Sequence, residues 1–486
     1  MTDRIRFVLD GEIRELRRVD PTLSVLNYLR GVERRCGTKE GCAEGDCGAC
    51  TVVLSELTEG GLRHRAVNAC ILFVPALDGK ALVTVESLRG ADGALHPVQR
   101  AMVECHASQC GFCTPGFVMS LYALYESEAL PERRRIEDVL AGNLCRCTGY
   151  RPIVAAAQRA YAYGERRDAS AAAATAALLR SIARHDTLAL EHKGRRFFAP
   201  RGIDALAELV ERFPEAHLLA GGTDVGLWVT KQHRALEALI HVGGVEGLDR
   251  VALGDTHIEI GAAATLADAE AMLAAQYPDF GELIRRFGSV QVRNAGTVGG
   301  NIANASPIGD TLPALIALDA SLVLRRGAQR RELPIDDFFL DNRKTTLGRG
   351  EFIERVRVPL ASAERRFRAY KVSKRFDQDI SAVCGAFSLA LERGRVSDIR
   401  LCYGGMAATP KRARACERAL IGRPWTEATI ASVLPVLDGC FAPISDMRAG
   451  AGYRRLVARN LLRKFQLETA GRPGATRLLA GERIPA

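Results

Sequence analysis

Residues 41–50 read GCAEGDCGAC and hold three of the chain's 14 cysteines. Cys42, Cys47 and Cys50 are separated by four and then by two residues, and Cys70 follows after another 19. This is the spacing of plant-type [2Fe–2S] proteins, in which thiolates from one loop converge on two irons. Glycines let such a loop turn tightly and direct N–H groups at sulfur. A four-cysteine zinc site favours two C-x2-C pairs, so the pattern favours an iron–sulfur cluster.

A second set of cysteines follows in a stretch with helical periodicity. Cys110 and Cys113 are two residues apart, and after 31 more residues Cys145 and Cys147 are separated by one. Each pair precedes a predicted helix, whose N-terminus stabilises thiolates. Zinc is an alternative for this set alone, but beside the first set a second redox cluster is the simpler interpretation. The isolated cysteines, expected to be small buried hydrophobic residues, are Cys36, Cys105, Cys384, Cys402, Cys416 and Cys440.

Patterning along the chain predicts an α+β multidomain protein. Residues 1–90 are mostly strand, with strands at 5–9, 12–16, 51–54 and 81–85 and a short helix at 24–30. Residues 91–163 are helical. Residues 164–190, which include a run of alanines, resemble a surface linker that is partly helical. Residues 191–360 mix strand and helix, residues 361–470 begin with strands and continue to a basic helix at 454–465, and residues 471–486 form a tail.

Composition narrows the class of protein. The 486 residues are 47% hydrophobic and 26% charged, as in globular proteins, which excludes disorder and collagen. No apolar run is long enough to cross a bilayer, and the N-terminus lacks a secretory signal, so we expect a cytoplasmic protein. The net charge of +10 comes from arginines spread along the whole chain. A compositional bias explains this better than a nucleic-acid-binding face, although a basic patch for an acidic partner or anionic cofactor stays open.

Two glycine-rich stretches lie downstream of the predicted linker, at 218–226 and 294–310. Each combines glycines with short polar residues, a composition that exposes backbone N–H groups suited to a pyrophosphate. Neither contains G-x-G-x-x-G, and the chain has no G-x-x-x-x-G-K-[ST], so Rossmann and P-loop sites are not supported. The stretches could be ordinary turns. Beside two redox clusters, a flavin becomes attractive, because it exchanges electrons singly with iron–sulfur clusters and in pairs with nicotinamide.

Five motifs together resemble the xanthine dehydrogenase family of molybdenum hydroxylases. They are residues 41–50, QCGFCTPG at 109–116, CRCTGY at 145–150, AGGTD at 220–224 and TVGGNI at 297–302. The resemblance covers about residues 1–470 and points to the iron–sulfur and FAD portion of such an enzyme. It implies a plant-ferredoxin-like β-grasp domain, a helical [2Fe–2S] bundle, an FAD domain of the vanillyl-alcohol-oxidase type and a C-terminal α+β domain. The boundaries would be 1–90, 91–163, a linker at 164–190, 191–360, 361–470 and a tail at 471–486.

The resemblance also implies roles for individual residues. The cluster ligands would be Cys42, Cys47, Cys50, Cys70, Cys110, Cys113, Cys145 and Cys147. The FAD contacts would be Leu219, Ala220, Gly221, Gly222, Thr223, Asp224, Val225, Gly226, Phe287, Thr297, Val298, Gly299, Gly300, Asn301, Asp310, Ile353 and Lys371. Gln109 would touch the pterin of a molybdenum cofactor on another chain. Asp377 and Asp379 match only approximately a loop that lines the nicotinamide side of the flavin.

The implied function is electron transfer within xanthine dehydrogenase. Electrons would run from a molybdenum-cofactor-binding large subunit through two [2Fe–2S] clusters to FAD and then NAD⁺, as hypoxanthine and xanthine are oxidised to urate. The subunits would form an α2β2 heterotetramer without nucleic acid or membrane. Three alternatives stay open: a stand-alone iron–sulfur flavoprotein reductase, a subunit of an aldehyde or N-heterocycle hydroxylase, and a cysteine-rich nucleic-acid-binding module. Gln109 favours xanthine dehydrogenase over a stand-alone carrier, which has no pterin to bind.

Overall fold

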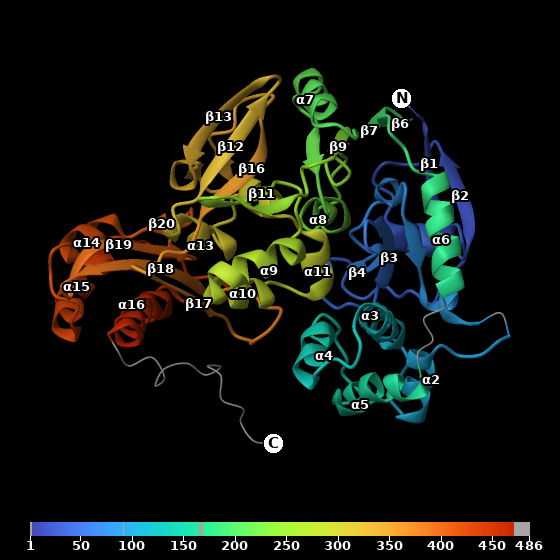
Figure 1. Ribbon diagram of the computed structural model, residues 1–486, viewed down its shortest axis with the longest axis horizontal. Helices are drawn as coiled ribbons and strands as arrows, with labels where there is room; N and C mark the ends of the chain where they lie inside the picture. Colours follow the sequence, from blue (N-terminus) through green and yellow to red (C-terminus); the bar gives the residue numbers. More distant parts are fainter. Residues whose placement is uncertain (1, 91, 165–168, 471–486) are drawn as a thin grey trace.

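The chain forms a row of sheets and helices, described by a computed structural model for residues 2–90, 92–164 and 169–470. The predicted tail at 471–486 lies outside the described residues. The N-terminal sheet is at one end of the long axis and the C-terminal sheet at the other (Figure 1). The mixed α/β multidomain architecture confirms the predicted fold class. No helix in the described ranges combines the length and the apolar character needed to cross a membrane.

The N-terminal sheet has the strand order β2-β1-β5-β3-β4, with β1 parallel to β5, which is a β-grasp arrangement. Helix α1 packs on it through Tyr28, whose ring meets Phe7 edge-on. The side chain of Ser24 caps α1 by accepting a 3.2 Å hydrogen bond from the Asn27 amide. The elements are β1 (Arg4–Leu9), β2 (Glu12–Arg17), α1 (Val25–Gly31), β3 (Thr51–Thr58), β4 (Gly61–Asn68), η1 (Val74–Leu77), β5 (Ala81–Val83) and η2 (Val85–Leu88).

Strand β4 was not among the predicted strands, and its polar sequence explains why. Arg65 of β4 is buried, which a pattern of alternating apolar residues does not anticipate. Its guanidinium reaches Asp268 of helix α9 (Leu266–Gln276), with Nη2 2.5 and 2.6 Å from the two carboxylate oxygens. The burial of Arg65 is therefore explained by its contact with Asp268, which lies 203 positions away in the sequence.

The predicted helical region forms a small bundle below the first sheet (Figure 1). Its helices pack around Phe117, Ile136 and Ile153, which are fully buried. The elements are α2 (Pro97–Glu104), α3 (Thr114–Ser127), α4 (Arg133–Leu140), α5 (Arg151–Ala160) and η3 (Tyr161–Tyr163).

The segment expected to be a linker carries helix α6 (Ala169–Ser181). Leu179 of α6 and Ile182 just after it are buried against Val8 and Ala81 of the first sheet. The helix therefore packs against the outer side of the β-grasp region (Figure 1), so this part of the segment is not a free surface linker.

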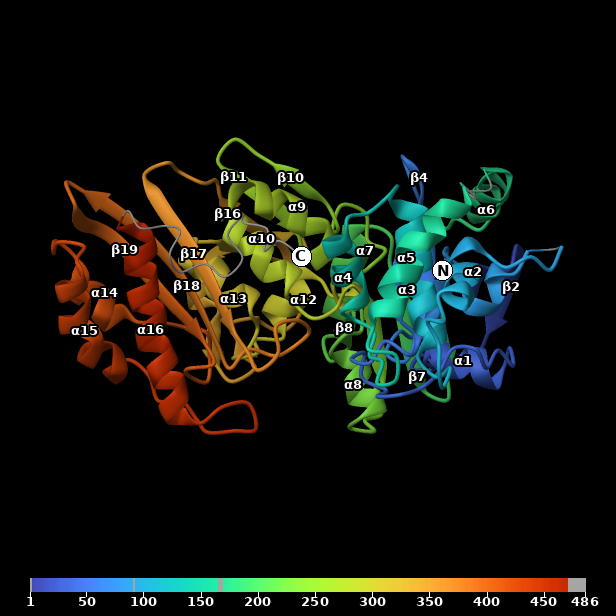
Figure 2. The same cartoon turned by 90° about the horizontal axis from the view of Figure 1, so that it is seen from below.

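The middle of the chain contains two larger sheets, ordered β6-β7-β9-β8 and β10-β11-β16-β12-β13, and the two-stranded sheet β14-β15. Helices pack between and around them (Figures 1 and 2). The strands are β6 (Leu188–His192), β7 (Arg195–Ala199), β8 (His217–Leu219), β9 (Ala238–His241), β10 (Val251–Leu253), β11 (His257–Gly261), β12 (Ser321–Arg326), β13 (Gln329–Pro334), β14 (Phe339–Asp341), β15 (Lys344–Thr345) and β16 (Phe352–Pro359). The helices are α7 (Ile203–Arg212), α8 (Val225–Thr230), α9 (Leu266–Gln276), α10 (Pro278–Arg285), α11 (Val290–Ala295), α12 (Val298–Ala303), α13 (Thr311–Ala317) and η4 (Ile335–Asp337).

The C-terminal region is a four-stranded antiparallel sheet with three helices. Figure 2 shows α16 lying across the sheet, where Leu462 and Phe465 are buried against it. The helix is longer than the predicted 454–465. The elements are β17 (Arg365–Val372), β18 (Val383–Glu392), β19 (Arg395–Gly404), β20 (Lys411–Arg412), α14 (Arg414–Leu420), α15 (Glu427–Gly439) and α16 (Ala451–Thr469).

Candidate cofactor-binding site

The first four cysteines lie in two close pairs. The Sγ atoms of Cys50 and Cys70 are 3.3 Å apart. Cys42 pairs with Cys47, and a hydrogen bond from the Cys47 thiol lowers the pKa of Cys42 to about 5. The backbone N–H groups of Asp46 and Cys47 also donate to Cys42 Sγ, each at 3.3 Å. The loop thus favours the thiolate of Cys42, the form that binds metal, whereas the same hydrogen bond and burial raise the pKa of Cys47.

The glycines of this loop are required by close packing. A Cβ on Gly41 would lie 2.7 Å from Cys47 Sγ. Gly48 has a φ of +69°, and a Cβ there would overlap the carbonyl of Gly142. A side chain at either position would displace the cysteines or the neighbouring loop.

The second four cysteines are also paired. The Sγ atoms of Cys110 and Cys147 are 3.6 Å apart. Burial raises the pKa of Cys113 to about 12, and a hydrogen bond with Cys145 adds to the rise. Cys113 caps helix α3, and the backbone N–H of Cys145 donates to the hydroxyl of Tyr150 at 2.9 Å.

Paired thiols fit a binuclear cluster better than a single ion. A [2Fe–2S] cluster takes four cysteines, two on each iron, whereas a structural zinc gathers all four around one point. Within the described ranges, no group of three or more His, Cys, Asp or Glu side chains is arranged to hold one metal ion. The two-plus-two arrangement of both sets therefore fits two [2Fe–2S] clusters.

The two sets differ in exposure. Cys110 and Cys147 are exposed, whereas Cys50 and Cys70 are buried. Gln109, next to Cys110, is exposed as well. The second set therefore reaches the surface at these two thiols although Cys145 is buried, whereas the other two thiols of the first set, Cys42 and Cys47, are half-buried.

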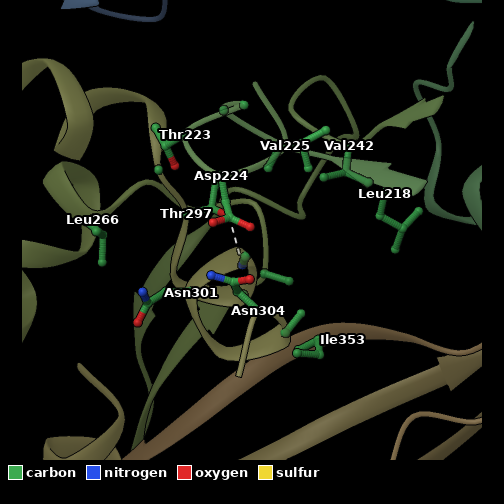
Figure 3. A pocket seen from close by; sticks show the side chains of 18 of the residues that line it. Leu218, Thr223, Asp224, Val225, Val242, Leu266, Thr297, Asn301, Asn304 and Ile353 are labelled. Atoms are coloured by element: carbon green, nitrogen blue, oxygen red, sulfur yellow. Dashed lines mark hydrogen bonds between the residues drawn. The ribbon is translucent and has the colours of Figure 1, made fainter. Parts of the chain in front are cut away.

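A cavity of about 390 Å³ lies between the two glycine-rich stretches. Figure 3 shows polar side chains at its centre, including Asp224, Thr297 and Asn301, with apolar side chains such as Val242 and Ile353 on its walls. Of the residues expected to contact FAD, those that line the cavity are Ala220, Gly221, Gly222, Thr223, Asp224, Val225, Phe287, Thr297, Gly299, Gly300, Asn301 and Ile353.

Five expected FAD contacts do not line this cavity, and two of them, Asp310 and Lys371, line a second cavity described below. Leu219 and Val298 are buried behind it in the core. Gly226 faces the first cluster region, where a Cβ would lie 2.7 Å from the carbonyl oxygen of Ile71. These residues support the loops from behind.

The glycine-rich stretches fit together through their backbones. A Cβ on Gly221 would overlap the carbonyl of Ala295, and a Cβ on Gly299 would lie 2.5 Å from the Cβ of Ala262. Thr297 caps α12, with its hydroxyl accepting a 3.0 Å hydrogen bond from the Gly300 amide. The cavity is therefore bordered by polypeptide backbone and short hydroxyls, which is the chemistry that a pyrophosphate requires.

A second cavity, of about 220 Å³, lies between the first cysteine loop and the C-terminal region. Phe287 lines both cavities, and Asp310 and Lys371 line the second, where their side chains form a buried ion pair. Asp310 Oδ1 is buried and has no hydrogen-bond partner among the described residues, as expected of a group that awaits a polar ligand. Asp379 lines this cavity, whereas Asp377 is not among its lining residues.

Sequence reasoning missed several residues of the first cavity. Trp228, Asn304 and Arg343 line it. Arg343, in the turn between β14 and β15, places its Nη1 atom 3.1 Å from Asn304 Oδ1 and 3.5 Å from Asp224 Oδ2. Trp228 is four residues beyond Asp224 on α8, so helical spacing could have identified it; Arg343 had no local signal.

Three protein-family models match this chain. A "[2Fe-2S] binding domain" matches residues 84–158, an "FAD binding domain in molybdopterin dehydrogenase" matches residues 192–361, and a "CO dehydrogenase flavoprotein C-terminal domain" matches residues 368–469. The matches lie on the helical bundle, on the two middle sheets and on the C-terminal sheet.

Curated relatives are xanthine dehydrogenases. The chain is 34% identical to the xanthine dehydrogenase of Emericella nidulans, over 95% of this chain and 38% of that protein. It is 31% identical to the xanthine dehydrogenase/oxidase of Gallus gallus, over 90% of this chain and 38% of that protein. The chain thus spans well under half the length of these relatives.

Solved structures extend the likeness to the fold. A carbon monoxide dehydrogenase chain from Hydrogenophaga pseudoflava aligns with a TM-score of 0.53 and 28% identity, over 55% of this chain and 94% of that one. Quinoline 2-oxidoreductase from Pseudomonas putida 86 aligns with a TM-score of 0.51 at 22% identity, over 56% of this chain and 95% of that one, which shows a shared fold.

The fold and the paired thiols define an iron–sulfur flavoprotein. The chain carries domains that match those of molybdopterin dehydrogenases, and it is similar to the iron–sulfur and FAD portion of the xanthine dehydrogenases. This confirms the resemblance predicted from the cysteine and glycine motifs.

Proposed function

We propose that the chain is the electron-transfer subunit of a xanthine dehydrogenase. Electrons enter from a molybdenum-cofactor-binding partner, pass through two [2Fe–2S] clusters to FAD and leave to NAD⁺, as hypoxanthine and xanthine are oxidised to urate. One observation carries the proposal: the two cysteine sets and the flavin cavity lie in a continuous series of contacts, because the Leu144 N–H beside Cys145 donates to the Cys47 carbonyl at 2.9 Å and Ile71 beside Cys70 packs against Gly222. This order suits entry at the helical bundle and exit at the flavin.

The contact between the first cysteine set and the flavin cavity supports this order. Ile71 follows the ligand Cys70 and packs against Gly222 and Gly226 of the first glycine-rich loop. The hydroxyl of Thr230 donates a 2.7 Å hydrogen bond to the carbonyl of Ala43 in the cysteine loop. The chain therefore holds the first cluster against the flavin site.

The length of the relatives supports the proposal of a large partner subunit. Because the chain spans 38% of the Emericella nidulans enzyme, most of that protein's length has no counterpart here. We propose that the molybdenum cofactor and substrate pocket lie on a second polypeptide, in an α2β2 heterotetramer in the cytoplasm. Gln109 and Cys110, both exposed, would face that partner, with Gln109 near the pterin.

The second cavity is the proposed nicotinamide end. A bound flavin exchanges single electrons with iron–sulfur clusters and electron pairs with a nicotinamide. Asp310 and Lys371 would hold its polar edge, since Asp310 keeps one unpaired oxygen there. Phe287, shared by both cavities, would lie against the ring.

The proposal divides the chain as predicted, into units at 1–90, 91–163, 191–360 and 361–470. The alternatives are a stand-alone reductase and a subunit of an aldehyde or N-heterocycle hydroxylase. The exposed thiols of Cys110 and Cys147, close to Gln109, favour a partner-dependent enzyme. The xanthine dehydrogenase relatives favour purine substrates.

Paired assays on the same preparations test the proposal. The chain with both clusters and FAD should pass electrons from NADH to an artificial dye and should not oxidise xanthine. Adding the partner should restore xanthine-dependent NADH formation. Gln109→Ala should slow that reaction and leave NADH–dye activity near wild type. Xanthine turnover by this chain alone, or NADH–dye activity without the flavin, would contradict the proposal.

A further inference from the structure

Four buried polar side chains meet where three parts of the chain join. They come from the start of β3, from α3, from the loop after α4 and from α11, and are at most 3% exposed. We call them the junction cluster: Thr51, Ser120, Asn143 and Gln291. Gln291 alone comes from the flavin-binding part, between 148 and 240 residues beyond the others.

The amide of Gln291 connects the other three members. Its Nε2 lies 3.1 Å from Ser120 Oγ, 3.1 Å from Asn143 Oδ1 and 3.2 Å from Thr51 Oγ1. The Ser120 hydroxyl also donates to Asn143 Oδ1 at 2.7 Å. A polar network this deeply buried holds its members in one arrangement, because each lost bond leaves an unsolvated polar group.

The junction cluster holds both cysteine loops. Asn143 Nδ2 donates to the carbonyl of Gly48 at 3.1 Å, and the Thr51 hydroxyl donates to the same carbonyl at 2.6 Å. Beside it, the backbone N–H of Leu144 donates to the carbonyl of Cys47 at 2.9 Å. Cys47 is a thiol of the first set, and Leu144 directly precedes Cys145 of the second.

Close backbone packing surrounds the same point. A Cβ on Gly142 would overlap Gln291 Oε1, and a Cβ on Gly116 would overlap the carbonyl of Gly48. The loops therefore approach each other closely at these glycines, and the amides of Asn143 and Gln291 lie at their meeting point.

Given the proposed function, we propose that Gln291 is a positioning residue that fixes the separation of the two cluster loops. It keeps the hydrogen bond between Leu144 and Cys47 in place as the contact that an electron crosses. Each crossing oxidises one cluster by one electron and reduces the other by one. The flavin-binding part thereby sets the spacing of clusters that it does not itself bind.

Electron paramagnetic resonance of the dithionite-reduced holoprotein tests this inference, because two nearby reduced clusters split each other's signals. The variants are Gln291→Leu, which removes the amide, and Ser120→Ala, which removes one of its partners with a smaller change of volume. The matched control is Gln466→Leu, which removes another buried glutamine amide on α16 in the C-terminal region. Iron, sulfide and FAD contents are measured on every sample.

Both test variants should retain wild-type iron and FAD contents and both cluster signals, but lose the splitting between them. Gln466→Leu should keep the splitting. Unchanged splitting in Ser120→Ala and in any folded Gln291→Leu would overturn the inference. Loss of iron from Ser120→Ala would overturn it too, since the junction would then serve cluster binding. A wild-type holoprotein without two [2Fe–2S] signals would overturn the proposed function as well, so the two failures are distinguishable.

Discussion

Ile71 lies directly against Gly226. A Cβ on Gly226 would fall 2.7 Å from the carbonyl oxygen of Ile71 and 2.8 Å from its Cβ. Ile71 follows the thiol Cys70, and Gly226 is in the first turn of α8, at the end of the loop that borders the larger cavity. The cysteine loop region and the flavin loop are therefore in van der Waals contact at Ile71, which also packs against Gly222.

Gly226→Ala should separate these two surfaces. Alanine ordinarily favours a helix over glycine, but here the added methyl group meets backbone that cannot move aside. We expect a loss of about 1–3 kcal/mol in unfolding free energy and a lower FAD content. Gly452→Ala on α16, where nothing lies within 4 Å of the new methyl, is the control. Flavin absorbance per chain and urea unfolding measure both effects; equal behaviour of the two variants would contradict the contact.

Cys47→Ser should remove the first cluster and spare the second. Cys47 pairs with Cys42, whereas the thiols of the second set pair with each other, as Cys110 does with Cys147. Low-temperature electron paramagnetic resonance of the reduced protein should show two distinct [2Fe–2S] signals in the wild type and one in the variant. Loss of both signals from a folded variant would argue against two independent sites.

The free energy of unfolding should decrease as the pH is lowered, because one histidine is buried in its neutral form. Burial lowers the pKa of His241 to about 3, so the folded protein binds this proton far less readily than the unfolded chain. The stability it lends is complete above the unfolded pKa of roughly 6.5 and is lost as pH falls, by roughly 2 kcal/mol at pH 5. His241→Gln should weaken the dependence of unfolding free energy on pH between 7.5 and 5. Exposed His185→Gln should keep the wild-type dependence; a shared slope in all three proteins would refute the assignment.

The cysteines outside the two sets should be dispensable for cofactors. Cys384, Cys402 and Cys416 are buried in the C-terminal region, and Cys440 lies at the end of α15. Burial raises the pKa of Cys416 to about 12, so its thiol stays neutral and inert. Alanine at each of the four should cost about 1–2 kcal/mol at most and leave iron and FAD contents unchanged. Cys145→Ala, by contrast, should lose iron; iron loss from any of the four would show that the ligands are misassigned.

Local sequence was sufficient to predict the cofactor chemistry and the fold class. Thiol spacing around Cys42 and Cys110 indicated two clusters, because ligands on one short loop must reach the metal by local backbone geometry. Glycine-rich loops around Gly222 and Gly299 indicated a cofactor cavity for a similar reason, since a backbone that approaches a phosphate needs glycine. Strand and helix periodicity predicted most of the N-terminal and helical elements.

Tertiary structure alone decided how these parts meet. The burial of Arg65 against Asp268 and the placement of Arg343 over the larger cavity join residues far apart in sequence. Gln291 shows the limit most clearly: on α11 it reads as an unremarkable polar residue, and only folding brings it beside Ser120 and Asn143. Motif spacing records which groups a local loop can offer to a ligand. The separation between two loops depends on contacts between residues that lie far apart in the sequence, so no local pattern predicts it.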